Sequence, residues 1–256
     1  MNEPTAQGTS DAVHDDLAER YGYAVDATLA AQLKYRLVLE HAPPDARVLD
    51  VGCANGLHTR KVAPHCREIV GIDLNVRMLD LARDVLAADG ANNAELLKMS
   101  ATELAFEDGS FDAAFCFSTL LLIPEAERVV AEMARVLRPG GIAVLDITGR
   151  RNLSQRHWGQ WWRSQGHPGL RSFTWPQARA LLASQGLEII TAPALGFLDQ
   201  WKYVPLLRRA ALLERVLHPS LDRDIDFAVS NLRPLRPFAN RWYAVCRRTP
   251  RAIAAP

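Results

Sequence analysis

Short apolar runs alternate with amphipathic stretches along most of the first 150 residues. The runs have the length and Val, Ile and Leu content of buried strands and lie at 47–52, 68–73, 94–100, 112–118 and 142–148. Apolar positions at helical spacing predict helices at 56–65, 75–90 and 125–141, the last ended by Pro139-Gly140-Gly141. Strands that are apolar throughout and separated by helices indicate a parallel sheet with helices on both faces.

Both ends of the chain depart from this alternation. Residues 1–12 are polar and expected to be a disordered tail, and helical spacing over 16–41, with a break near Gly22, predicts an N-terminal helical cap spanning 13–45. The alternating core covers 46–150. In 151–256 a tryptophan-rich stretch comes first. The elements expected after it are a helix at 174–186, a strand at 187–192, a helical region at 193–240 and a strand at 241–248.

Composition narrows the functional classes. The chain has 256 residues, a net charge of +1 and 48% hydrophobic residues, so it has no charge bias toward nucleic acid. The polar, acidic N-terminus does not resemble a secretory signal. The four cysteines, at 53, 66, 116 and 246, have no metal-ligand spacing. We expect reduced thiols, no metal site and a cytoplasmic location.

The first predicted strand ends in a turn with very little side chain. VLDVGCANG contains Gly52-Cys53-Ala54-Asn55-Gly56, and the next strand ends in Asp73. A glycine turn before a helix exposes backbone N–H groups, and an acid after the second strand can bind a ribose diol. The pattern predicts a nucleoside-containing cofactor, either a dinucleotide or S-adenosylmethionine. Alanine at position 54 fits the dinucleotide pattern G-x-G-x-x-G poorly.

Four stretches between residues 47 and 148 follow one another at family-like intervals. They are VLDVGCANG, GIDLNVRMLDLAR, SATELAFEDGSFDAAFCFS and EMARVLRPGGIAVLD. Together they resemble the class I S-adenosylmethionine-dependent methyltransferases of the small-molecule, type 11-like kind. The resemblance implies an α/β fold, a doubly wound, seven-stranded Rossmann-like sheet with helical lid insertions, and S-adenosyl-L-methionine as cofactor.

The resemblance also implies roles for individual residues. Gly52 and Gly56 would let the methionine end of the cofactor approach the backbone, with Asp50 near its amino group and Asp73 on the ribose. Ser100 replaces the family's adenine-binding aspartate. Ala54 replaces a family glycine; alanine is the smallest change, and we expect it to be tolerated where φ is negative. The full expected cofactor set is Asp50, Gly52, Cys53, Ala54, Asn55, Gly56, Asp73, Leu74, Met78, Ser100, Ala101, Thr102, Cys116 and Phe117.

The acceptor side is less defined by sequence. Leu121 and Leu122 stand where many relatives carry histidines, which favours an apolar pocket over a histidine base at that point. The aromatic stretch near 150–175 predicts either a substrate lid or a satellite core. Candidate bases are His157, His167 and Tyr21, the last on a segment that closes over the cofactor in relatives. The expected pocket residues are Tyr21, Leu121, Leu122, His157, Trp158, Trp161 and Trp162.

We therefore expect methyl transfer to a lipophilic or aromatic small molecule, first at oxygen, then at carbon or nitrogen. Two alternatives stay open: a protein that binds the cofactor without transferring methyl, and an NAD-linked oxidoreductase. The sequence lacks a basic arm and the Asn-Pro-Pro-aromatic motif, so no nucleic-acid partner is expected. The amphipathic segment 204–218 could contact a membrane, although packing on its own domain is favoured. The sequence does not determine the oligomeric state.

Overall fold

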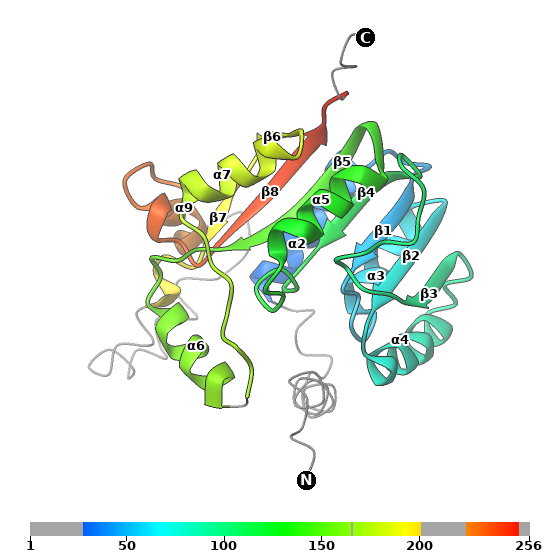
Figure 1. The fold of residues 1–256 in the computed structure, drawn as a ribbon, viewed down its shortest axis with the longest axis horizontal. Helices are drawn as coiled ribbons and strands as arrows, with labels where there is room; N and C mark the ends of the chain where they lie inside the picture. The colour runs from blue at the N-terminus through cyan, green and yellow to red at the C-terminus, as the bar shows by residue number, and fades with distance from the viewer. Residues whose placement is uncertain (1–27, 165, 201–223, 251–256) are drawn as a thin grey trace.

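A central β-sheet organises the molecule (Figure 1). The structure is a computed structural model that describes residues 28–164, 166–200 and 224–250. Within these residues the sheet has eight strands in the order β3-β2-β1-β4-β5-β8-β6, with β7 also paired to β8. The strands are β1 Arg47–Val51, β2 Glu68–Asp73, β3 Ala94–Lys98, β4 Phe111–Cys116, β5 Leu137–Thr148, β6 Leu187–Thr191, β7 Ala194–Leu195 and β8 Arg241–Arg248.

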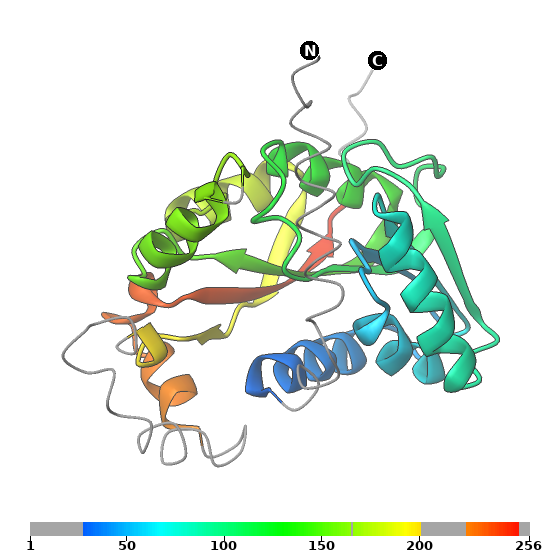
Figure 2. The ribbon, with the colours of Figure 1, turned by 90° about the horizontal axis from the view of Figure 1, so that it is seen from below.

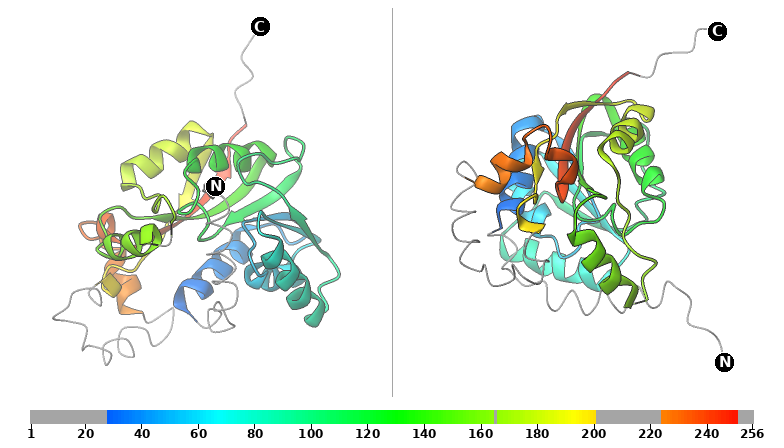
Figure 3. Two further views of the ribbon diagram at one scale, coloured as in Figure 1. Left: turned by 60° about the horizontal axis from the view of Figure 1, so that its bottom comes forward. Right: turned by 90° about the vertical axis from the view of Figure 1, so that its left-hand side faces the viewer.

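Helices cover both faces of the sheet (Figure 2). The first face packs against α2 Leu29–His41 and α3 Leu57–Val62, and the opposite face packs against α5 Ala126–Val136 and α7 Trp175–Ser184. Figure 3 shows α9 Ile225–Ser230 on the same side of β8 as α2. The remaining helical elements are α4 Val76–Ala88, α6 Ser154–Ser164 and the 3₁₀ turns Ala63–His65 and Arg236–Phe238.

Strands β1 to β5 are parallel, and β8 runs antiparallel to β5, β6 and β7. The chain order reverses at β1, which pairs with β2 on one side and with β4 on the other. In such sheets ligands bind beyond the carboxyl ends of the strands at this switch point. Asp50 pairs with Gly71 and with Phe115, so the ends of all three strands meet there.

The five strands expected in the core and the final strand are confirmed, but two boundaries differ from expectation. Helix α5 ends at Val136, because Leu137 already pairs with Phe111 in the sheet; the Pro139-Gly140-Gly141 segment therefore belongs to β5. Residues 193–240 are not wholly helical, since Ala194 and Leu195 form β7 and raise the strand count to eight. The predicted segments at 16–27 and 204–218 lie outside the described residues.

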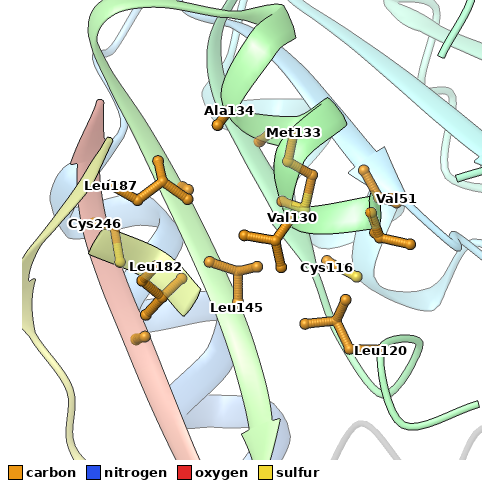
Figure 4. Packing of buried hydrophobic residues seen from close by; sticks show 14 of the residues in the cluster. Val51, Cys116, Leu120, Val130, Met133, Ala134, Leu145, Leu182, Leu187 and Cys246 are labelled. Atoms are coloured by element: carbon orange, nitrogen blue, oxygen red, sulfur yellow. The ribbon is translucent and has the colours of Figure 1, made fainter. Parts of the chain in front are cut away.

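The larger of two apolar clusters lies between the sheet and helices α5 and α7. Figure 4 shows Cys116 of β4 among Val51, Leu120 and Val130, pointing into this cluster. All four cysteines carry free thiols. Among the described segments, no helix combines the length and apolar character that crossing a bilayer requires.

Candidate functional site

The chain leaves β1 through a turn with left-handed backbone at three positions. Gly52 and Gly56 have φ of 76°, and Ala54 has φ of 47°. A Cβ at Gly52 would lie 2.3 Å from Thr119 Oγ1, and one at Gly56 would lie 3.0 Å from the Cβ of Ala82. Both glycines are thus required by protein neighbours as well as by backbone angle. Since φ is positive at Ala54, the condition under which alanine was expected to be tolerated there does not hold.

The conformation of Ala54 is explained by its partner. Its N–H donates to Asp73 Oδ2 at 3.0 Å, while the N–H of Asn75 donates to Asp73 Oδ1 at 2.9 Å. Asn75 is the N-cap of α4, because its side chain accepts from the N–H of Met78 at 2.9 Å. Asp73 is therefore not the cap. It joins the β1 turn to the end of β2.

The surroundings of Asp73 fit a nucleoside. A carboxylate has about four lone-pair positions, and the two backbone bonds use only one on each oxygen. Asp73 is partly exposed, so the remaining positions can accept from two neighbouring hydroxyls. Leu74 beside it is 52% exposed and offers an apolar surface, whereas Met78 is buried. An acid next to an exposed apolar side chain suits a ribose diol carrying a flat base.

Ser100 lies beside the same acid. The N–H of Met99 donates to the main-chain carbonyl of Asp73 at 3.1 Å, and Ser100 Oγ lies 2.8 Å from Thr102 Oγ1. Arg135 of α5 fixes the following segment by donating to two of its main-chain carbonyls, at 2.7 and 2.8 Å. The hydroxyl pair is therefore held on a firm connection between β3 and β4.

Asp50 lies beneath the turn. Its side chain is 1% exposed and accepts from Thr59 Oγ1 at 2.6 Å. Burial raises the pKa of Asp50 to about 7, with the negative charge of Asp73 adding to the effect and the Thr59 hydrogen bond opposing it. This acid can change its protonation state near neutral pH beside the candidate cofactor site.

A second buried aspartate, which the sequence analysis did not single out, lies at the carboxyl end of β5. Asp146 Oδ2 is 3.4 Å from Lys34 Nζ, and its Oδ1 is 3.9 Å from Arg241 Nη1. Asp146 also accepts from the N–H of Ser118 at 2.8 Å and from its Oγ at 3.3 Å. Two signals in the sequence could have predicted this pair: Asp146 is a charged residue within the apolar run 142–148, and Lys34 lies on the apolar face of a helix.

Two aromatic rings enclose an imidazole next to this cluster. His58 of α3 lies edge-on to Tyr35 at 5.4 Å and to Phe117 at 5.2 Å between ring centroids. Its Nδ1 is buried and has no hydrogen-bond partner among protein atoms in the described part of the chain. Burial, with a contribution from Lys34, lowers the pKa of His58 to about 3, so the ring is neutral at physiological pH. No pattern in the sequence pointed to His58.

The expected cofactor residues divide by exposure. Seven have accessible surface at the turn or beside it: Gly52, Ala54, Asn55, Asp73, Leu74, Ser100 and Thr102. Seven are buried: Asp50, Cys53, Gly56, Met78, Ala101, Cys116 and Phe117. Cys116 in particular points into the α5 cluster and not toward the strand ends, so it does not line the candidate site directly.

The expected acceptor residues are only partly brought together. Both ring nitrogens of His167 are engaged, Nε2 with the Leu122 carbonyl at 3.1 Å and Nδ1 with the Gly169 N–H at 3.2 Å. That arrangement gives His167 a structural role, with the ring of Trp162 5.2 Å away. Trp158 is 41% exposed on α6.

The other expected acceptor residues also range from exposed to buried. His157 is exposed and lies beside Trp158. Trp161 and Leu122 are partly exposed, whereas Leu121 is buried. Tyr21 lies outside the described residues.

Comparisons with curated proteins agree with this geometry. Residues 49–145 match the family model described as "Methyltransferase domain". A phosphatidylethanolamine N-methyltransferase from Cereibacter sphaeroides is 41% identical over 100 residues, which is 39% of this chain and 49% of that protein. A ubiquinone biosynthesis O-methyltransferase from Dechloromonas aromatica is 36% identical over 105 residues, 41% of this chain and 45% of that protein. The matches span about half the length of these relatives.

A solved structure extends the agreement in fold beyond the matched segment. The YcgJ protein from Bacillus subtilis has a TM-score of 0.60 with this chain at 20% identity and covers 86% of this chain and 99% of its own length. At this identity the likeness concerns the fold. The sequence match identifies residues 49–145 as a methyltransferase domain, and the strand order and the likeness to YcgJ agree with that domain in fold.

Proposed function

We propose that the protein transfers a methyl group from S-adenosyl-L-methionine to a lipophilic or aromatic small molecule, with oxygen as the first expected acceptor atom. The observation that carries this proposal is the contact between the Ala54 N–H and Asp73 Oδ2. That contact joins the glycine turn after β1 to the acid after β2, where a ribose diol can be held. S-adenosylmethionine supplies a methyl group on a positively charged sulfur.

The protein's own residues supply binding and orientation. Asp73 would accept from the ribose hydroxyls, Leu74 would cover one face of the adenine, and Ser100 would accept from the adenine amino group. Asp50 favours a cationic ligand when ionised. A methyl transfer of this kind needs an aligned acceptor and an environment with little water more than it needs strong acid–base groups.

The acceptor class is inferred from the surface around the strand ends. Leu121 and Leu122 follow β4, and α6 places Trp158 and Trp161 with their ring centroids 6.0 Å apart. The exposed ring of Trp158 and the partly exposed Trp161 and Leu122 suit a ring-bearing or lipid-like acceptor. The two curated relatives are named for phosphatidylethanolamine and for ubiquinone biosynthesis, which are acceptors and pathways of that lipophilic kind.

The first experiment measures binding of S-adenosylmethionine and S-adenosylhomocysteine by calorimetry. Asp73→Ala should weaken both ligands by roughly 10- to 100-fold, because it removes charge-assisted hydrogen bonds. Asp80→Ala is the matched control, since Asp80 lies on the exposed face of α4 and pairs with Arg83. Unchanged affinity in Asp73→Ala would contradict this placement of the ribose.

The second experiment measures S-adenosylhomocysteine formation with lipophilic phenols, hydroquinones and phosphatidylethanolamine as acceptors. Product with a phenol or hydroquinone supports the proposal, and product with the amine moves the reaction to nitrogen. Tight cofactor binding without product from any of them would favour the alternative, a cofactor-binding protein that does not transfer methyl. A rise in melting temperature with NAD, but not with S-adenosylmethionine, would favour the oxidoreductase alternative.

A further inference from the structure

The strongest unassigned feature is the group of charged and polar side chains at the carboxyl ends of β4 and β5. Lys34 and Asp146 are 7% and 1% exposed, whereas Ser118, which contacts both, is exposed. A buried ion pair commonly contributes little net stability, because desolvation offsets the attraction. Stability alone therefore does not explain why Lys34 and Asp146 are buried together. Their contact with the exposed Ser118 hydroxyl indicates a role in holding that hydroxyl.

Of the two side chains that contact the Ser118 hydroxyl, only one can accept its hydrogen. Lys34 Nζ lies 3.1 Å from Ser118 Oγ, and an ammonium can only donate. Asp146 Oδ2 lies 3.3 Å from the same oxygen, and a carboxylate can only accept. The hydroxyl therefore donates to Asp146 and accepts from Lys34, and among the described residues one of its lone pairs stays free.

The backbone of Ser118 is also held in an uncommon conformation. Its φ is 56°, in the left-handed region that residues other than glycine rarely occupy. The Ser118 N–H donates to Asp146 Oδ1 at 2.8 Å, so both polar groups of the serine bind the same carboxylate. Such strain persists only where neighbouring contacts enforce it, and it is frequent at functional sites.

The hydroxyl lies beside the candidate cofactor turn. The next residue, Thr119, donates to the Gly52 carbonyl at 3.4 Å and fills the space next to the Gly52 Cα. The preceding residue, Phe117, lies against His58, the second residue of the helix that follows the turn. The buried Nδ1 of His58, which has no hydrogen-bond partner in the described ranges, is a second polar atom in this neighbourhood with unused hydrogen-bonding capacity.

We propose that Ser118, oriented by Lys34 and Asp146, is the specificity-determining residue for the acceptor and selects a group that carries a hydrogen, such as a hydroxyl or an amine. This inference rests on the proposed function for its meaning, because it names the chemistry of the methyl acceptor. With its own hydrogen committed to Asp146, the serine cannot donate to a ligand. A methylated hydroxyl, or an amine that has lost its last hydrogen to methylation, no longer offers the hydrogen that Ser118 accepts, so it binds more weakly than the substrate and leaves.

The test uses two probes, 2-naphthol and 2-methoxynaphthalene, in which the same oxygen carries either a hydrogen or a methyl group. Their dissociation constants are measured by ligand-observed NMR with the full chain, with and without S-adenosylhomocysteine. The wild type should bind 2-naphthol about fivefold or more tightly than its methyl ether, the size expected for one hydrogen bond. Ser118→Ala should bring the ratio close to one, while Ser110→Ala, at the other end of β4, should leave it unchanged.

A charge-neutral double variant tests the orientation itself. In Lys34→Met/Asp146→Asn the asparagine amide can donate to Ser118, which frees the serine hydrogen for the ligand. The ratio should then fall close to one, as in Ser118→Ala, because a serine that donates can bind the oxygen of either probe. Circular dichroism confirms that each variant is folded. Ser118→Ala keeps the test decisive if the double variant does not fold.

Two results would overturn the inference: an equal ratio in wild type and Ser118→Ala, or no binding of either probe at about 1 mM to folded protein. The cofactor measurement separates this inference from the proposed function. If S-adenosylhomocysteine does not bind while the probe ratio behaves as expected, only the cofactor role fails. If it binds and the ratio is one, only the selection by Ser118 fails.

Discussion

Two aspartates at the carboxyl ends of β1 and β5 are equally buried and carry opposite pKa shifts. Asp50 and Asp146 are each 1% exposed. Burial raises the pKa of Asp50 to about 7, since its hydrogen-bonding partner is the neutral Thr59. Burial acts in the same direction on Asp146, but the positive charges of Lys34 and Arg241 more than offset it and leave the pKa below its usual value.

The comparison shows that the neighbours of a buried acid, and not its depth, decide its charge at neutral pH. On the cofactor side the protein keeps an acid that a bound cation can ionise. On the proposed acceptor side it keeps a carboxylate with a lowered pKa, which accepts from the Ser118 hydroxyl. The predictions below either remove this difference or make it measurable.

The largest effect is expected from removing the cation of the β5 pair. Lys34→Met should lower the free energy of unfolding by about 3–5 kcal/mol, because it leaves a buried carboxylate with Arg241 as its remaining cationic neighbour, 3.9 Å away. Urea denaturation followed by circular dichroism measures the change. Lys34→Met/Asp146→Asn should recover most of the loss, since neither charge is then left alone. Equal losses in the single and double variants would show that side-chain packing, not charge, is responsible.

The next effect concerns the pH dependence that Asp50 contributes. Folding raises its pKa from 3.8 to about 7, so the folded protein binds more protons than the unfolded chain between these values. The free energy of unfolding should therefore fall as the pH rises from about 4 to 7, by up to about 4 kcal/mol. Asp50→Asn should remove this part of the slope in denaturation curves recorded at pH 5, 6, 7 and 8.

The raised pKa of Asp50 also predicts how the binding of a cationic ligand depends on pH. S-adenosylmethionine should bind more tightly as the pH rises through 7, because its positive charges favour the ionised form of Asp50. Calorimetry in buffers with different ionisation enthalpies should detect proton release on binding below pH 7 in the wild type and less in Asp50→Asn. Asp84→Asn, on the exposed side of α4, is the control. Binding without proton release in the wild type would mean that the ligand's charges lie away from Asp50.

The two regions also differ in how well the sequence predicts them. The cofactor side depends on residues close in sequence, so the glycine turn and Asp73 could be inferred from pattern and resemblance. The acceptor side depends on Lys34, Ser118 and Asp146, which come from α2, the end of β4 and β5. Single charged residues within apolar patterns were visible, but only the fold shows that they meet.

The same reasoning explains the boundary errors. Leu137 continues the apolar pattern of the helix before Pro139, but it pairs with Phe111 of β4 and therefore belongs to β5. Residues 194–195 are too few to give a strand pattern, and β7 exists because β8 offers a free edge there. Helix α6 was expected only as an aromatic polar stretch, although Trp158, Trp161 and Trp162 stand at the i, i+3, i+4 spacing of one helix face and were the available signal.

The smallest effect compares two strained residues, one from each region. Ala54 and Ser118 both have left-handed backbone, with φ of 47° and 56°. A residue with a side chain loses roughly 1–2 kcal/mol in this conformation, and glycine avoids that loss but orders a freer chain on folding. Ala54→Gly should therefore raise the free energy of unfolding by about 0.5–1 kcal/mol, and it keeps the N–H that binds Asp73.

Ser118→Gly relieves the same backbone strain but should lower the free energy of unfolding. It removes a hydroxyl that binds both Lys34 and Asp146, and two such contacts to charged groups outweigh the backbone gain. Thermal and urea denaturation of the two glycine variants, side by side, measure the difference. A gain in both would mean that the Ser118 hydroxyl contributes little to the fold, whereas a loss in Ala54→Gly would mean that its methyl group packs against a neighbour important for the turn.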